Sequence, residues 1–370
     1  MIKAIKVQLK PNNKQKSLLH QSAGTARWAY NWALDKQEAN YQAGGKFLSD
    51  ATLRQELTKL KRTQFTWLYL YSCDIPKQAI KDACEAYKKM FKKLAKKPQF
   101  KSKRFTKPAF YQDLCKLKIT DKHAQLSVIG KIKLAEFGRI PTAGKYSNPR
   151  ITFDGLNWWL SVGIEYQLEP QLAETQAIGI DLGVKDLAII STGKVYKNVN
   201  KQKPVKKANK RIKRLQKQAS RQYEILKKFK KGKSKNLVKL ERRILKTHQR
   251  LTNLRTNHIH QMTTELVKTK PEAIVIEDLN VVGMMKNRHL SKAIANQKLA
   301  EVRRQLEYKC LWAGIRLVVA NRWFPSSKLC SVCGQVKRDL KLSDRIYRCD
   351  CGNVIDRDYQ AAINLSKLAA

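Results

Sequence analysis

The chain has 370 residues, 42% of them hydrophobic, which predicts two or three folded domains and argues against a disordered polymer. It carries 76 Lys and Arg against 29 Asp and Glu, and this net charge of +47 opposes a compact state unless a polyanion neutralises it. Because no stretch reaches about 18 apolar residues, we expect no membrane partner, and the composition favours nucleic acid.

The first half of the chain combines short strands with helices. Residues 2–9 alternate basic and apolar side chains as a strand does, and Pro11 ends this pattern. Short strand-like segments return between 114 and 168 and predict a small β-barrel, which the first strand could complete. Between these strands, apolar residues recur every three or four positions, which predicts helices over residues 14–43, 50–63 and 76–96. We therefore expect a barrel built from residues 1–13 and 111–172, with a helical domain over 14–110 inserted into it.

The second half begins after Glu169-Pro170, which marks a predicted boundary. Strands are expected near 177–184, 187–190 and 194–197. Residues 201–250 then hold 21 Lys or Arg and only two acids, yet keep apolar residues at helical spacing. This pattern predicts two long basic helices broken at 231–234, followed by a further helix over about 256–269. A solvated charged helix is the usual explanation of such a run, but this imbalance favours contact with phosphates.

Three acids lie at the ends of apolar elements: Asp181 and Glu277 each follow a predicted buried strand, and Asp358 opens the last helix. Acids at the edge of a buried sheet are costly unless cations compensate them. Two Mg²⁺ ions, which prefer carboxylate and water oxygens, would do so. Such a pair, about 4 Å apart, can activate water and stabilise the leaving oxygen of a phosphodiester. Mn²⁺ is an open alternative.

Neighbouring acids allow other assignments. Asp186 is expected to brace a turn, and Asp278 should point away from Glu277 because adjacent strand residues face opposite sides. Asp356 is the main rival of Asp358, since it could instead cap the last helix. The spacing alone does not decide between these two.

Four of the eight cysteines cluster near the C-terminus, whereas Cys73, Cys84, Cys115 and Cys310 are scattered. In this cluster, two residues separate Cys330 from Cys333, and one residue separates Cys349 from Cys351. Fifteen residues lie between the two pairs. This arrangement predicts one structural zinc ion in a ribbon, with no open position for catalysis. Metal ligands and free thiols indicate a reducing, cytoplasmic location. Because the ribbon lies between Glu277 and Asp358, we expect it to help place the third carboxylate.

Four segments in this order resemble the transposon-encoded TnpB family, which is related to the type V CRISPR effector nucleases. They are Gly179-Ile-Asp-Leu-Gly-Val-Lys-Asp-Leu-Ala, Val275-Ile-Glu-Asp-Leu-Asn, Pro325-Ser-Ser-Lys-Leu-Cys-Ser-Val-Cys-Gly, and Asp356-Arg-Asp followed by Ala-Ala-Ile-Asn. The resemblance implies that Asp181, Glu277 and the second acid of Asp-x-Asp, Asp358, are the catalytic carboxylates. One departure is Gln360, where the family often has Asn.

The resemblance also implies an α+β multidomain fold. It consists of an RNase-H-like (RuvC) nuclease domain over 173–326 and 355–370 with the zinc ribbon at 327–354 inserted, an N-terminal β-barrel wedge domain, and an inserted helical recognition domain. The implied activity is cleavage of double-stranded DNA beside a short adjacent motif, directed by a guide RNA derived from the transposon end. A prokaryotic protein that acts at the nucleoid, as a monomer or weak dimer with one RNA, is expected.

The nucleic-acid contacts are assigned from charge and from the resemblance. The basic helices supply a channel for the backbone of a guide–target duplex. Position in the resemblance suggests that the N-terminal helices read the adjacent DNA motif. The candidate residues are Tyr71, Lys77, Gln78 and Lys81 for this motif, and Lys206, Lys207, Arg211, Lys213 and Arg214 for the backbone. Trp28, Tyr30 and Trp32 could stack on bases, but such aromatics on a helix face more often belong to a core.

Three other functions compete with a guided nuclease. A nuclease-inactive, RNA-guided DNA-binding protein is disfavoured by the complete acid trio. A DNA-joining transposase also uses three acids, but a zinc ribbon before the final Asp is not its expected layout. An RNA-binding zinc-ribbon module without chemistry is disfavoured by the carboxylates at strand ends.

Overall fold

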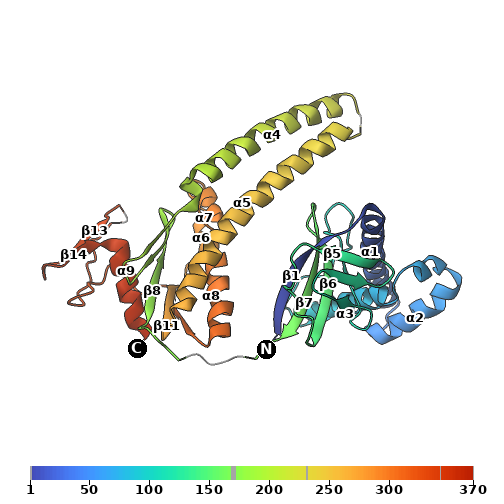
Figure 1. Cartoon of the computed structure of the whole chain (residues 1–370), viewed down its shortest axis with the longest axis horizontal. Helices are drawn as coiled ribbons and strands as arrows, with labels where there is room; N and C mark the ends of the chain where they lie inside the picture. Colours follow the sequence, from blue (N-terminus) through green and yellow to red (C-terminus); the bar gives the residue numbers. More distant parts are fainter. Residues whose placement is uncertain (1, 168–171, 231, 342, 370) are drawn as a thin grey trace. The chain divides into compact units, whose positions relative to one another are not determined.

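The computed structural model describes residues 2–167, 172–230, 232–341 and 343–369, and Figure 1 traces them. The chain divides into two compact units, Met1–Gln167 and Leu168–Ala370. The predicted boundary at Glu169-Pro170 lies outside the described residues. None of the described helices is long and apolar enough to cross a membrane.

The first unit contains one seven-stranded antiparallel sheet in the order β2-β6-β7-β1-β5-β4-β3. The first strand of the chain lies between β7 and β5, as expected for a strand that completes the later ones. Hydrogen bonds do not close the described strands into a full barrel, because the edge strands β2 and β3 do not pair with each other. The strands are β1 (Ile2–Lys10), β2 (Ala109–Tyr111), β3 (Lys118–Ile119), β4 (His123–Leu126), β5 (Gly130–Leu134), β6 (Tyr146–Phe153) and β7 (Trp158–Glu165).

Helices α1 (Asn13–Gln42), α2 (Asp50–Thr63) and α3 (Asp74–Phe91) and the 3₁₀ turn η1 (Thr66–Leu70) lie between β1 and β2. α1 begins with a capping box in which Asn12 and Gln15 satisfy each other's backbone amides. Tyr30 is buried in the core of this unit, and the partly buried Trp28 and Trp32 pack against that core. The prediction that these aromatics belong to a core is confirmed.

The second unit is built on a five-stranded sheet in the order β10-β9-β8-β11-β12. β8, β11 and β12 run parallel, whereas β9 and β10 are antiparallel additions at one edge. The strands are β8 (Ile178–Leu182), β9 (Asp186–Ile190), β10 (Val195–Lys197), β11 (Ala273–Glu277) and β12 (Arg316–Ala320). Together the two units give the expected α+β fold.

Helices cover both faces of this sheet (Figure 1). Ile178, Ile180, Ile274 and Ile276 share a core with α5 (Lys235–Lys268) and α8 (Leu299–Ala313). Ala273 and Val275 pack on the other side with Leu365 of α9 (Arg357–Ser366). Side chains alternate along a strand, so β8 and β11 contribute their odd-numbered residues to the face that α9 covers.

The contact between α9 and β8 depends on Gly179. A Cβ atom at this position would lie 2.0 Å from the carbonyl oxygen of Ala362 and 2.5 Å from the amide nitrogen of Ser366. Both neighbours are backbone atoms of α9 and cannot rotate away. Only glycine therefore allows this helix to lie directly on the strand.

The basic run forms a hairpin of two long helices, α4 (Lys203–Lys228) and α5, which lie side by side in Figure 1. The break predicted at 231–234 is confirmed over the described residues, and Ser234 caps α5 by accepting from the Leu237 amide at 3.1 Å. The separate helix predicted over 256–269 is wrong: α5 continues to Lys268. Residues 251–256 contain neither Gly nor Pro, so nothing interrupts the helix there.

The remaining elements are short. They are η2 (Val199–Lys201), α6 (Val281–Met284), α7 (Ser291–Gln297), the hairpin β13 (Ile346–Arg348) and β14 (Val354–Asp356), and the terminal turn η3 (Lys367–Ala369). The hairpin runs directly into α9, because β14 ends at the residue before this helix begins.

Candidate active site and nucleic-acid interface

Two of the three predicted carboxylates lie on neighbouring strands. Asp181 is on β8 and Glu277 ends β11, and the register between these strands pairs Ile180 with Ile276. Each acid follows its paired isoleucine, so both side chains point to the face that α9 covers. The alternation that buries Ile180 and Ile276 thus brings the two carboxylates to one edge of the sheet.

The third carboxylate, Asp358, lies in the first turn of α9. Burial raises the pKa of Asp181 well above its ordinary value, and repulsion from Glu277 and then Asp358 raises it further. Burial also raises the pKa of Glu277, against the opposing hydrogen bond from Ser326, and Asp358 adds to the shift. The structure therefore brings Asp181, Glu277 and Asp358 within electrostatic reach of one another.

The neighbouring acids have other partners. Asp356 is the N-cap of α9, and its Oδ1 accepts from the amides of Asp358 and Tyr359, both at 3.0 Å. Asp278 lies away from the trio, with Arg303 at 2.7 Å and Arg322 at 2.5 Å from its carboxylate. Asp186 opens β9 and lies 3.6 Å from Lys197. The expectations that Asp356 caps the helix and that Asp278 points away are confirmed.

Two arginines hold the Asp358 carboxylate. Arg357 donates to Oδ1 from Nε at 3.1 Å and from Nη2 at 2.9 Å, and Arg345 Nη1 lies 3.5 Å from Oδ2. Arg345 comes from the cysteine ribbon, where the Arg357 amide also donates to its carbonyl at 2.9 Å. Neither arginine was among the site residues predicted from the sequence. Arg357 could have been found from its place between two acids, but the approach of Arg345 depends on how the ribbon folds.

The electrostatics of the trio suit divalent cations. Burial and mutual repulsion raise the pKa values of Asp181 and Glu277 in spite of Arg357 and Ser326, and hard cations bind carboxylate oxygens. Among the described residues, only the four ribbon cysteines place three or more His, Cys, Asp or Glu ligand atoms close enough for a single ion. The three carboxylates are thus not positioned to hold one ion together unless they move closer to one another.

The four cysteines form a compact cluster whose sulfur atoms all lie within 4.8 Å of one another. Cys330 and Cys351 are 3.6 Å apart at sulfur, as are Cys333 and Cys349. A tetrahedral zinc with Zn–S bonds of about 2.3 Å requires sulfur separations of about 3.8 Å, so the cluster fits zinc. The distances are far too long for disulfides.

The electrostatics of these thiols also suit a cation. Burial acts to raise the pKa of Cys330, but hydrogen bonds from the Cys333 and Val332 amides and from Asn353 outweigh it and lower this pKa to about 6. At Cys351 the Asn353 amide acts to lower the pKa, but Cys349 and its neighbours raise it to about 12. The thiols thus oppose one another's ionisation, and a bound cation would relieve this repulsion.

Gln360, the departure from the family pattern, connects this cluster to α9. The side-chain Nδ2 of Asn353 donates to Gln360 Oε1 at 2.9 Å and to the Cys330 sulfur at 3.5 Å. The side chain of Gln360 is fully buried. The longer side chain thus reaches a ribbon residue that contacts a cysteine, so ribbon and helix are linked at this point.

The basic helix hairpin contains a groove with a volume of 990 Å³. Seven cations line it: Lys203, Lys207, Arg211 and Arg214 from α4, and Arg243, Lys246 and Arg250 from α5. Over the described ranges, none of the seven forms an ion pair with an acid. Of the five backbone contacts predicted here, Lys207, Arg211 and Arg214 line the groove, whereas Lys206 and Lys213 are exposed outside it.

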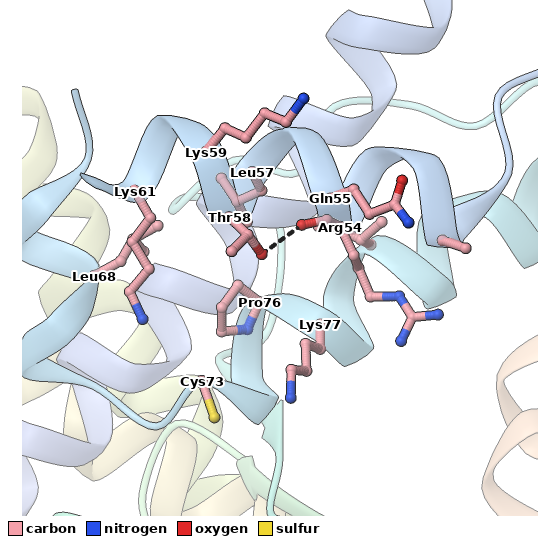
Figure 2. A pocket seen from close by; sticks show the side chains of 12 residues that line it. Arg54, Gln55, Leu57, Thr58, Lys59, Lys61, Leu68, Cys73, Pro76 and Lys77 are labelled. Atoms are coloured by element: carbon pink, nitrogen blue, oxygen red, sulfur yellow. Dashed lines mark hydrogen bonds between the residues drawn. The ribbon is translucent and has the colours of Figure 1, made fainter. Parts of the chain in front are cut away.

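The four residues predicted to read DNA lie in the first unit, three of them on α3. Lys77 lines a pocket of 510 Å³ between α2 and α3, with Arg54 and Lys61 on its rim and Pro76 beside it (Figure 2). Gln78 donates to Asp82 at 2.9 Å. Lys81 is exposed, and Tyr71 is partly buried with its ring 6.2 Å from that of Trp67. Their roles stay predictions.

Comparison with known proteins decides the family. A family model described as "Probable transposase" matches residues 160–288, and one described as "Cas12f1-like, TNB domain" matches residues 300–365. A third, described as a helix-turn-helix domain, matches residues 1–46, which here form a strand followed by one long helix.

A Streptomyces pristinaespiralis protein named "Putative RNA-guided DNA endonuclease" is 33% identical over 371 residues, covering 98% of this chain and 88% of that protein. The Escherichia coli K12 protein "Putative RNA-guided DNA endonuclease InsQ" is 30% identical over 366 residues, which cover 94% of this chain and 87% of that protein. "TnpB-like protein L79" of Acanthamoeba polyphaga mimivirus is 30% identical over 202 residues, which are 53% of this chain and 38% of that protein. This chain belongs to the TnpB family.

Solved structures similar to this TnpB chain are more distant. A Cas12f1–sgRNA–target DNA complex matches with a TM-score of 0.34 and 17% identity, covering 99% of each chain. The mini-RNA-guided endonuclease CRISPR-Cas_phi3 matches with a TM-score of 0.48 and 10% identity, covering 100% of this chain and 92% of that one.

Replacing Asp181 with Asn should stabilise the protein in magnesium-free buffer that leaves zinc bound. The raised pKa means that the folded state disfavours the Asp181 carboxylate, so stability falls as pH rises through its titration, and a neutral amide avoids this cost. We expect a gain of about 1 kcal/mol, or roughly 2–4 °C in the melting temperature of a unit of this size. Asp186→Asn is the control and should show no gain. An equal rise in both variants would contradict the account.

Purified protein should contain one zinc by elemental analysis. Cys351→Ser should lose the zinc and most metal-dependent activity, because Arg345 and the start of α9 are held by the ribbon. RNA retention should survive, because the basic groove lies on other helices. Cys115→Ser, an exposed thiol outside the cluster, is the control. Full activity in zinc-free protein would show that the ribbon does not support the site.

Proposed function

We propose that this chain is an RNA-guided DNA endonuclease that hydrolyses double-stranded DNA at Asp181, Glu277 and Asp358. The observation that carries the proposal is the meeting of three acids from separate segments at one sheet edge, where the pKa values of two are raised. A structural ion pair would have neutralised these acids. Membership of the TnpB family, with relatives named as RNA-guided endonucleases, supports the same function.

Asp181, Glu277 and Asp358 would hold two Mg²⁺ or Mn²⁺ ions in the proposed reaction. When bound, such ions supply an activated water and stabilise the leaving oxygen of the phosphodiester. The Ser326 hydroxyl donates to Glu277 Oε1 at 2.5 Å and so fixes the orientation of that carboxylate. Arg345 and Arg357 hold Asp358 in place and keep two positive charges close to where phosphate enters.

The guide RNA is assigned to the basic hairpin. Lys203, Lys207 and Arg211 follow one another every four residues on α4, which spaces them by about 6 Å along the axis. A row of unpaired cations at this spacing suits a sugar–phosphate backbone, since neutralising phosphates releases counterions. In the proposed function the RNA derives from the transposon end, and base pairing selects the target.

The remaining assignments complete the proposal. Residues 14–110 would form the recognition domain inserted in a wedge domain of 1–13 and 111–172, and Tyr71, Lys77, Gln78 and Lys81 would read the short motif beside the target. Residues 173–326 and 355–370 would form a RuvC-like nuclease domain that carries the ribbon of residues 327–354. The competing function, a nuclease-inactive RNA-guided DNA-binding protein, predicts the same RNA and DNA binding without cleavage.

Cleavage should require RNA, a divalent ion and each acid of the trio. With co-purified RNA, matching duplex DNA and Mg²⁺, Asp181→Ala should slow cutting by roughly 10²–10³-fold or more, the usual cost of losing one charge-stabilising group. The control Asp186→Asn should cut like the parent. RNase treatment should abolish specific cutting. Equal cutting by Asp181→Ala would refute the site, whereas guided binding without any cutting by the parent would favour the nuclease-inactive function.

Reversing charges in the groove should weaken RNA binding. The double variant Lys207→Glu/Arg211→Glu should lose at least about tenfold in RNA affinity at physiological salt and show a shallower salt dependence, because fewer phosphates are neutralised. Lys210→Glu/Lys217→Glu makes the same charge change on exposed positions of α4 outside the groove and serves as the control. Equal losses in both variants would mean that net charge, not the groove, binds the RNA.

A further inference from the structure

Trp323 is exposed next to the carboxylate edge. Its side chain is 85% exposed, whereas Trp67 is 37% exposed and the other five tryptophans are more buried. Exposing a whole indole gives up the burial that makes tryptophan favourable in a folded protein. The ring contributes little to the core, so its position calls for another explanation.

The loop that carries Trp323 is fixed on both sides of the indole, to the last residue of β11 and to the residue that follows it. On one side, Arg322 Nη2 lies 2.5 Å from Asp278 Oδ2, and Asn321 Oδ1 accepts from the Trp323 amide at 2.9 Å. On the other side, the Ser326 hydroxyl donates to Glu277 Oε1 at 2.5 Å. These contacts bind the loop to two consecutive acids, so the indole is presented from an ordered backbone.

This arrangement places the indole near the proposed chemistry. Ser326 lies three residues after Trp323 in the chain, so the two Cα atoms are at most about 11 Å apart. Ser326 in turn contacts Glu277 directly. The loop thus sets the distance between an aromatic face and the carboxylates.

We propose that Trp323 is a stacking platform for an unpaired base of the strand that is cut, an inference that rests on the proposed function. Aromatic side chains bind single strands because every base has a face on which they can stack. Inside a duplex these faces are already covered by neighbouring bases. Arg322 and Arg345, both exposed, supply positive charge for the phosphates of the same strand. Trp323 therefore positions a single-stranded segment for cutting.

The binding test uses the Asp181→Asn protein with its RNA, so that target DNA is bound and not cut. The fluorescent base 2-aminopurine is placed in turn at positions along each DNA strand, because an indole stacked on it quenches its emission. One or two adjacent positions should be quenched, and Trp323→Ala should restore their emission. Trp323→Phe should retain much of the effect, whereas Trp323→Leu, which is apolar without an aromatic face, should not.

Cleavage by the otherwise unchanged protein gives the second measurement. Trp323→Ala and Trp323→Leu should cut about tenfold more slowly, as expected for the loss of one stacked base, and Trp323→Phe should stay close to the parent. Melting temperatures should match the parent, since the ring is exposed. The inference would be overturned if Trp323→Leu quenched 2-aminopurine and cut DNA as well as Trp323→Phe. It would also be overturned if Trp323→Ala left the emission unchanged or markedly lowered the melting temperature. Failure of the parent to cut would instead count against the proposed function.

Discussion

The close approach of α9 to β8 is the constraint on which the site depends. At Gly179 the strand and the helix touch backbone to backbone, with no space for a Cβ atom. Asp181 lies two residues along the same strand, and Asp358 lies one turn before Ala362 on the helix. A side chain at position 179 would push the helix away and separate these acids. Packing thus sets the distance between groups that repel each other.

The repulsion between Asp181, Glu277 and Asp358 persists in the folded protein. Asp181 and Glu277 are held at one sheet edge with raised pKa values, which costs stability in the absence of metal. The hydrophobic contacts of β8 and β11 with α5 and α8 offset that cost. The ribbon restrains the third acid, because Arg345 pairs with Asp358 and Asn353 bonds to Gln360. A site arranged in this way gains stability when cations bind.

The sequence predicted the features that follow from local periodicity. The ends of two apolar strands indicated Asp181 and Glu277, and the Cys spacing indicated the ribbon. It could not predict contacts that depend on how separate segments meet, such as Arg345 on Asp358. The length of α5 was underestimated because its charge pattern changes near residue 250 while its backbone does not. The groove likewise depends on helix rotation, which places Lys207 inside and Lys206 outside.

The central claim is that the three carboxylates together hold divalent metal ions. The most direct measurement is anomalous diffraction from crystals of the RNA- and DNA-bound protein soaked in Mn²⁺, with Asp181→Asn crystals for comparison. The account predicts manganese peaks in contact with Asp181, Glu277 and Asp358, with Asp358 released from at least one arginine, and loss of these peaks in the variant. Manganese absent from these acids, with both arginines still on Asp358 in a complex that cuts DNA, would contradict it.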